Sequence, residues 1–153
     1  MQPIPSRAFW GPQWFFAAFA LMWVSISALL SVLGGWSSLA SHFRSERPHE
    51  GERFRFVSGS MGTALLPVSY SRCLFITVNE GGFGLSILFL FRLLSPPLFI
   101  PWSAVESIES RRFLFVDRAV VKLRDRWQTI SVRGVAGDHL REAYLRATRA
   151  HAP

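Results

Sequence analysis

The longest uninterrupted apolar stretch of the chain runs from Trp14 to Leu33 and contains no charged residue. A helix of about 20 residues, rising about 1.5 Å per residue, is long enough to cross a hydrocarbon core about 30 Å thick. The pattern therefore predicts one transmembrane helix over residues 14–33. Residues 1–13 contain three prolines, which disfavour a helix, and are expected to form a short tail outside the cytosol.

The segment after this helix changes character in two steps. Residues 36–43 place apolar side chains at the spacing of one helix face, which predicts a short helix lying along the membrane surface. Charged residues and Pro48 follow, and a proline ends such a helix. Residues 34–52 are therefore expected to form a juxtamembrane linker.

From Arg53 onward the pattern becomes typical of β-strands, with short alternating or apolar runs separated by turn residues. The strands are expected at 53–58, 72–79, 83–91, 99–102, 105–116, 119–124 and 127–133. A glycine-rich turn at 80–82 makes the second and third strands a hairpin, and further turns are expected at 117–118 and 125–126. About seven antiparallel strands are therefore expected.

The period of the pattern changes to that of a helix at Gly137. Asp138 is a suitable cap, and the apolar residues that follow share one helix face: Leu140, Ala143, Tyr144 and Ala147. An amphipathic helix can cover the open end of a small bent sheet. We therefore expect residues 53–150 to form one mainly-β domain with a C-terminal helix.

Four short motifs resemble those of an uncharacterised family of small bacterial membrane proteins. The motifs are GGWSSLASHFR, SGSMG, YSRCLFITV and PPLFIPW, and they cover roughly residues 34–105. Seven strands and one terminal helix, with PLFIPWSAVESIE past the middle, also resemble the pleckstrin-homology (PH) and GRAM-like superfamily. The resemblance implies a PH-like fold and membrane attachment, and it implies no activity. Arg53, Arg55 and Arg72 are only a loose substitute for the basic cluster that holds phosphoinositides in eukaryotic homologues.

The basic residues predict the orientation of the chain. Lys and Arg number 17 against 10 Asp and Glu, and all of them except Arg7 follow the apolar stretch. By the positive-inside rule the N-terminus is outside and the domain is cytosolic, in a bacterial inner membrane. A lone Cys73 allows no intramolecular disulfide, which fits the cytosol. The alternative is a signal peptide cleaved near Ser38 and Ala40, but the apolar run is longer than a usual signal core.

The stretch from Leu85 to Trp102 allows two interpretations. It is long enough for a second transmembrane helix, but Arg92 and three prolines make a membrane span costly. As two strands joined by a loop, it places residues 90–97 at a tip of large apolar side chains around one arginine. That tip is then either core beneath a neighbouring strand or a contact with lipid or a partner.

No motif specifies a reaction. SGSMG approximates a nucleophile elbow, but no helix or histidine follows it, so a glycine-rich turn is expected. Cys73 fits a small buried hydrophobe. The four histidines do not fall at metal-ligand spacing, so no metal or cofactor is expected. Arginines alternate with Phe54 and Phe56, but in a strand both rings would face the core, so nucleic acid is not an expected partner.

We therefore expect a single-pass membrane protein whose domain is a non-catalytic binding or scaffolding module. Besides the bilayer itself, its expected partner is either the anionic lipid head groups of the inner leaflet or a membrane protein. The residues expected to make the contact are Phe91, Arg92, Leu93, Leu94, Arg111 and Arg112. Two alternatives stay open: a structural subunit acting through its helix, and an enzyme with a site in the loop from Ser60 to Tyr70. The oligomeric state is left open.

Overall fold

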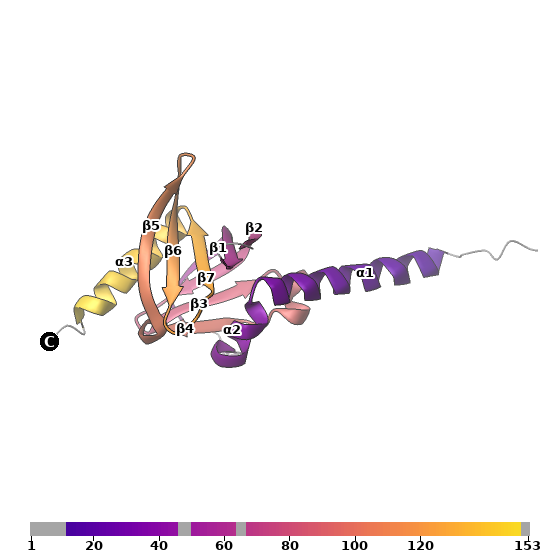
Figure 1. The fold of residues 1–153 in the computed structure, drawn as a ribbon, viewed down its shortest axis with the longest axis horizontal. Helices are drawn as coiled ribbons and strands as arrows, with labels where there is room; N and C mark the ends of the chain where they lie inside the picture. Colours follow the sequence, from indigo (N-terminus) through magenta and orange to yellow (C-terminus); the bar gives the residue numbers. More distant parts are fainter. Residues whose placement is uncertain (1–11, 46–49, 64–66, 151–153) are drawn as a thin grey trace, which may run out of the picture.

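A long helix and a curled sheet make up the computed structural model, which describes residues 12–45, 50–63 and 67–150. Helix α1 (Pro12–Leu33) extends away from the rest of the molecule (Figure 1). Only 6% of its most apolar window is buried, and its length and composition suffice to span a membrane. Helix α2 (Trp36–Phe43) follows after a tight turn, and helix α3 (Val135–Ala150) ends the described chain.

Within the described residues the sheet has seven antiparallel strands in the order β4-β3-β2-β1-β7-β6-β5. The strands are β1 (Glu52–Gly62), β2 (Pro67–Val78), β3 (Gly82–Ile87), β4 (Leu98–Pro101), β5 (Val105–Phe113), β6 (Val116–Leu123) and β7 (Thr129–Arg133). The long strand β1 pairs with β2 along most of its length and with β7 only from Gly59 to Gly62. This shared strand joins the two halves of the sheet, which curls around a common core (Figure 1).

The core fills the inner face of the curl and is closed by α3. Leu140 is fully buried, and the Tyr144 hydroxyl donates a hydrogen bond of 3.0 Å to the carbonyl of Glu106 on β5. Helix α3 begins at Val135, so Asp138 lies inside its first turn and the expectation that Asp138 caps the helix is wrong. An apolar N-terminal helix, seven antiparallel strands and a terminal helix confirm the expected fold, a mainly-β PH-like domain behind one long helix.

Helix α2 was expected on the membrane surface, and for its apolar face that prediction is wrong. Trp36 and Leu39 are fully buried in the domain core. The Trp36 indole N–H donates a hydrogen bond of 2.8 Å to the carbonyl of Pro96. Arg44, just beyond α2, pairs with Leu98 of β4 in an isolated bridge. The first part of the segment expected to be a linker is therefore built into the domain.

Two turns differ from those expected. The third strand ends at Ile87, and residues 89–94 form a short 3₁₀ helix, η1 (Phe89–Leu94), before β4. A second 3₁₀ turn, η2 (Trp102–Ala104), leads into β5. The turn between β5 and β6 lies at Leu114 and Phe115, and residues 117–118 belong to β6. The interpretation of 85–102 as a second transmembrane helix is wrong, and two strands with an intervening loop are confirmed.

An irregularity in β1 redirects one phenylalanine. The register shifts between Phe54 and Val57, and Phe56 has a left-handed backbone with φ of 56°. A bulge of this kind breaks the alternation of faces. Phe56 is therefore exposed and packs on Phe75 with ring centroids 5.5 Å apart, whereas Phe54 is half-buried. The expectation that both rings face the core is wrong for Phe56.

Candidate functional site

The 3₁₀ helix η1 lies beside α1. The rings of Phe91 and Trp23 have centroids 5.2 Å apart. Trp23 is ten residues before the end of α1, which corresponds to about 15 Å along a helix. Phe89 is 75% exposed and Arg92 is exposed. Part of the loop after β3 therefore lies alongside α1, beyond the point where α1 joins the domain.

The predicted contact residues fall in two separate places. Phe91 and Arg92 lie in η1, next to α1. The side chains of Leu93 and Leu94, in the same turn, are outside the part of the chain that the structure describes. Arg111 and Arg112 lie near the far end of β5, beside the turn into β6. The β5–β6 hairpin points away from α1 (Figure 1).

Both arginines on β5 are engaged in surface ion pairs. Arg111 contacts Glu109 at 3.1 Å, and Arg112 contacts Asp117 at 2.9 Å. A hydrogen bond from Lys122, and then one from Arg111, lower the pKa of Glu109 below its ordinary 4.5. The hydrogen bond from Arg112 likewise lowers the pKa of Asp117. Water screens exposed pairs of this kind, so their effect is on local charge more than on stability.

The tip of the β5–β6 hairpin is apolar, exposed and strained. Leu114 and Phe115 have φ of 46° and 69°, and they are 74% and 98% exposed. A two-residue turn with both φ values positive is the type I′ geometry, which asparagine and glycine adopt at the lowest cost. Sequence reasoning missed this turn because neither residue is a turn former.

Three arginines line an open groove on the outer face of the sheet. Arg53 and Arg55 come from β1, and Arg92 comes from η1. The groove has a volume of about 450 Å³, and small side chains of β2 and β3 line it between the arginines: Thr77, Gly84 and Ser86. The register places Gly84 beside Thr77 and Ser86 beside Phe75. Arg53 and Arg55 stand out in the sequence as an alternating pair, but no pattern in it indicates that Arg92 lies beside them.

A smaller cavity separates the end of α1 from the domain. It has a volume of about 290 Å³ and lies between the last turns of α1, strand β2 and the η1 segment. Its lining includes six hydroxyl-bearing residues: Ser27, Ser31, Ser69, Tyr70, Ser71 and Ser95. Leu30, Val68, Ile87, Phe91 and Cys73 complete the lining, which contains no charged residue. We call this space the junction cavity.

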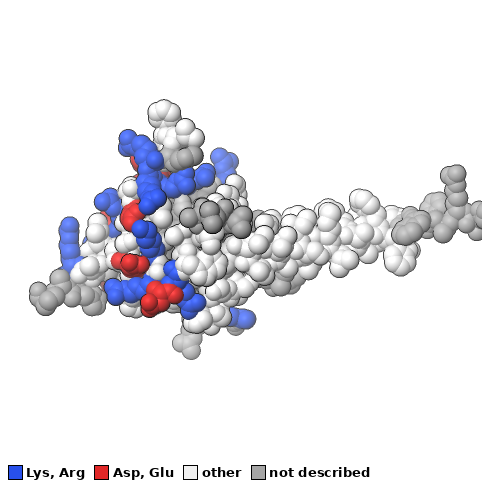
Figure 2. All heavy atoms as spheres, viewed as in Figure 1, with Lys and Arg blue, Asp and Glu red and all other residues white. Residues whose placement is uncertain are grey.

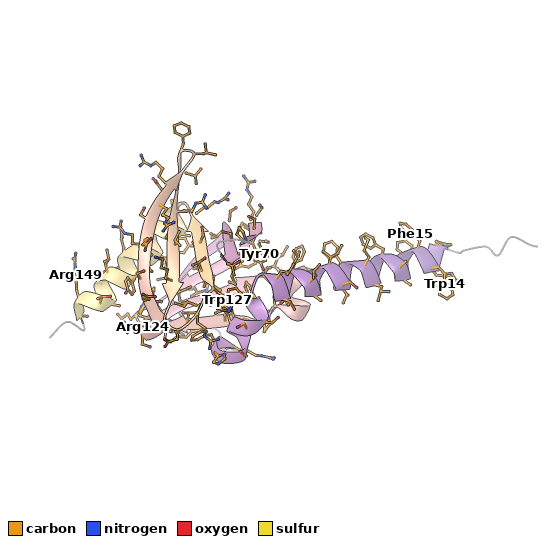
Figure 3. All side chains as sticks on the ribbon, viewed as in Figure 1. Trp14, Phe15, Tyr70, Arg124, Trp127 and Arg149 are labelled. Atoms are coloured by element: carbon orange, nitrogen blue, oxygen red, sulfur yellow. The ribbon has the colours of Figure 1, made fainter. Side chains whose placement is uncertain are left out.

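Tyr70 is the most unusual residue of the junction cavity. It is 8% exposed, and among the described residues no atom forms a hydrogen bond with its phenol oxygen. Burial, and then the nearby Cys73, raise the pKa of Tyr70 to about 12, so the phenol is protonated at neutral pH. Figure 3 shows Tyr70 where α1 meets the domain. No pattern in the sequence indicates this site, because its residues come from distant segments of the chain.

The residues considered for catalysis do not form a recognisable reactive group. Ser58 to Gly62 lie inside β1, so the expectation of a turn there is wrong, and the strand-to-helix geometry of a nucleophile elbow does not apply. Ser60 pairs with Ser69 of β2 and Ser131 of β7. Burial raises the pKa of the Cys73 thiol, which lowers its nucleophilicity at neutral pH. Among the described residues, no three His, Cys, Asp or Glu gather as metal ligands would.

The comparisons with known proteins do not identify the chain. No protein-family model matches it, and a search of curated proteins finds no significant match.

Proposed function

We propose that this protein is a single-pass membrane protein whose PH-like domain is a non-catalytic binding module docked on anionic lipid head groups. The observation that carries the proposal is the packing of η1 on α1, at Phe91 and Trp23. If α1 crosses the bilayer, a segment beside Trp23 lies among lipids. The exposed Phe89 then contacts acyl chains, and the domain is held with one side against the leaflet.

Charge and chemistry favour anionic lipid over a neutral surface. Arg92 of η1 lines the same groove as Arg53 and Arg55. One end of the groove is therefore at the segment that packs beside α1. Guanidinium groups form paired hydrogen bonds with phosphate oxygens. A long arginine side chain can keep its charged end at head-group level while its stem lies deeper. Figure 2 shows the charged side chains over the domain and none along α1.

The first experiment measures whether η1 enters the bilayer. The full chain, with Cys73→Ala and Phe89→Cys, is labelled with an environment-sensitive dye and reconstituted into nanodiscs containing lipids with a quencher on the acyl chain. We expect quenching at position 89. The control places the dye at position 148 on α3, where Thr148 is exposed and we expect none. Equal quenching at both positions, or none at position 89, would contradict docking.

The second experiment measures lipid preference. The full chain is extracted from nanodiscs of equal phosphatidylglycerol and phosphatidylcholine, and the bound lipids are counted by native mass spectrometry. A basic residue at an anionic surface contributes about 1 kcal/mol, so Arg53→Gln with Arg55→Gln should reduce the preference for phosphatidylglycerol by roughly 10- to 30-fold. The matched control, Arg141→Gln with Arg149→Gln on α3, removes the same charge. An equal effect of both pairs would mean that the preference depends on the total charge of the domain and not on the groove.

A protein partner is the second candidate, and the β5–β6 tip favours it. Phe115 is 98% exposed on a hairpin that points away from α1, and Arg111 and Arg112 flank it. A photo-crosslinking amino acid at position 115 should give one discrete adduct in native membranes. The same amino acid at position 127, where Trp127 is exposed, serves as the control. Identical adducts at both positions, or none at 115, would contradict a partner at this tip.

A further inference from the structure

We infer that the junction cavity binds the glycerol-ester region of one membrane lipid, with an acyl chain lying along α1. This inference rests on the proposed function, because it requires α1 to cross the bilayer. The inference adds a second kind of lipid contact to the proposed function. The arginine groove would hold the charge of a head group, whereas the junction cavity would hold the uncharged part of a lipid.

The cavity lies at the depth where lipid esters lie. Ser27, Leu30 and Ser31 line it from the last two turns of α1. A hydrocarbon core of about 30 Å takes about 20 helical residues, so the last turns of this 22-residue helix lie at the edge of the core. The cavity is therefore level with the boundary between acyl chains and head groups.

The lining matches the chemistry of an ester. Carbonyl oxygens accept hydrogen bonds, and the residues that line the cavity include Tyr70 and five serines, whose hydroxyl groups are donors. The Tyr70 phenol stays protonated and has no partner among the described residues. The phenol oxygen is buried and lies close to Gly34 at the end of α1, so a lipid carbonyl would reach it by entering between them, and would then supply the missing partner.

The rest of the lining argues against other ligands. No charged residue lines the cavity, so nothing in it neutralises a phosphate or a carboxylate. Leu30 on α1 and Phe91 on η1 provide an apolar wall for the first methylenes of an acyl chain. The volume of about 290 Å³ is just below the range of ligand cavities, which is about 300–1,000 Å³. The cavity therefore suits one segment of a lipid better than a whole bulky molecule.

The test uses the full chain in nanodiscs that contain a phosphatidylcholine with a photoreactive diazirine near the ester end of one acyl chain. After irradiation, the labelled peptides are identified by mass spectrometry. Lipids that merely surround the membrane-facing segments would label α1 and η1 alone. We expect additional labelling within residues 67–78, the strand β2 that forms the far wall of the cavity.

Two variants address the cavity directly. Tyr70→Phe keeps the ring and removes the hydroxyl, and a lost hydrogen bond of about 1 kcal/mol predicts about 5-fold less label on β2. Tyr144→Phe is the matched control, because it changes the only other tyrosine of the chain, which lies on α3. Ser69→Trp places a large side chain at an exposed position that lines the cavity, and we expect it to abolish the β2 label.

The outcomes separate this inference from the proposed function. Label confined to α1 and η1, with position 89 still quenched, would overturn the inference, mean that the cavity holds only water, and leave docking intact. Equal β2 labelling in the wild type and in both cavity variants would also overturn it. The probe lipid is zwitterionic. The arginine variants should therefore keep the β2 label even where they lose the preference for anionic lipid.

Discussion

At the residue scale, Gly35 allows the apolar helix to turn into the domain. Its φ is +71°, and an added Cβ would lie 2.8 Å from Cγ of Gln128, which is fully buried. A left-handed backbone costs an L-residue about 1–2 kcal/mol, and the contact with Gln128 adds to that cost. The position therefore combines a conformational and a steric demand for glycine.

We predict that Gly35→Ala lowers the free energy of unfolding by about 2–3 kcal/mol, measured by thermal unfolding in detergent. Two glycines separate the contributions. Gly134 has the same φ of +71° with no atom within 4 Å of an added Cβ, so Gly134→Ala measures the backbone cost alone. At Gly81 an added Cβ would meet no atom closer than 3.7 Å, so Gly81→Ala should be nearly neutral. A Gly35→Ala effect no larger than that of Gly134→Ala would refute the contact with Gln128.

Glu109 gives a prediction about pH. Its carboxylate accepts hydrogen bonds from Lys122 and Arg111, which lower its pKa below the ordinary 4.5. A carboxylate with a lowered pKa stabilises the fold above pH 4.5, and that contribution is lost as the pH falls through the lowered value. Thermal unfolding from about pH 6 down to about pH 3 should therefore depend less on pH in Glu109→Gln than in the wild type. Glu80→Gln, at an exposed position, should behave like the wild type.

At the element scale, α2 connects the apolar helix α1 to the sheet. The buried indole of Trp36 donates its hydrogen bond to Pro96, in the segment between η1 and β4. Trp36→Phe leaves that carbonyl without its donor and leaves a small void. We predict that the free energy of unfolding falls by about 1–3 kcal/mol, measured from unfolding curves recorded by near-ultraviolet circular dichroism. The exposed Trp127 is the control, since Trp127→Phe should change the stability much less.

The β5–β6 turn allows stability and binding to be separated. Leu114→Asn with Phe115→Gly supplies residues that favour a type I′ turn. The free energy of unfolding of the double variant should therefore be about 1–3 kcal/mol higher than that of the wild type. If the tip binds a partner, a photo-crosslinking amino acid at the neighbouring position 116 should give an adduct in the wild-type background and none in the double variant. A variant that is both less stable and poorly folded would contradict the type I′ assignment.

At the scale of the whole molecule, the orientation of the chain is open to a direct test. All basic residues except Arg7 follow the apolar stretch, so we predict that the domain is cytosolic. A fluorescent protein fused to the C-terminus should fluoresce, and alkaline phosphatase fused there should be inactive. The reverse pattern would place the arginine groove outside the cell and contradict docking on the inner leaflet.

The sequence predicted the fold well and the sites only in part. Alternation and turn residues located all seven strands, because both depend on local sequence. The apolar face of α2 was also found, but whether it meets lipid or protein depends on the tertiary structure. The bulge at Phe56 and the turn at Leu114 contradict local preference, so no local rule finds them.

The candidate sites depend on register and on contacts across the chain. Arg53 and Arg55 stood out as an alternating pair, yet Arg92 joins them only because η1 folds back along the sheet. The junction cavity was missed entirely, since serines and one tyrosine from α1, β2 and the η1 segment have no common spacing. Such sites are not visible before the elements are assembled.

The tight connection between α1 and the domain has a mechanical consequence. Two glycines are all that separate α1 from the buried α2, and Phe91 of η1 contacts Trp23 midway along α1. A transmembrane helix changes its tilt when the thickness of the bilayer changes. With these contacts in place, a change in the tilt of α1 would swing the whole domain toward or away from the leaflet. If α1 crosses the bilayer, the protein would act as a lever that converts membrane thickness into the position of its domain.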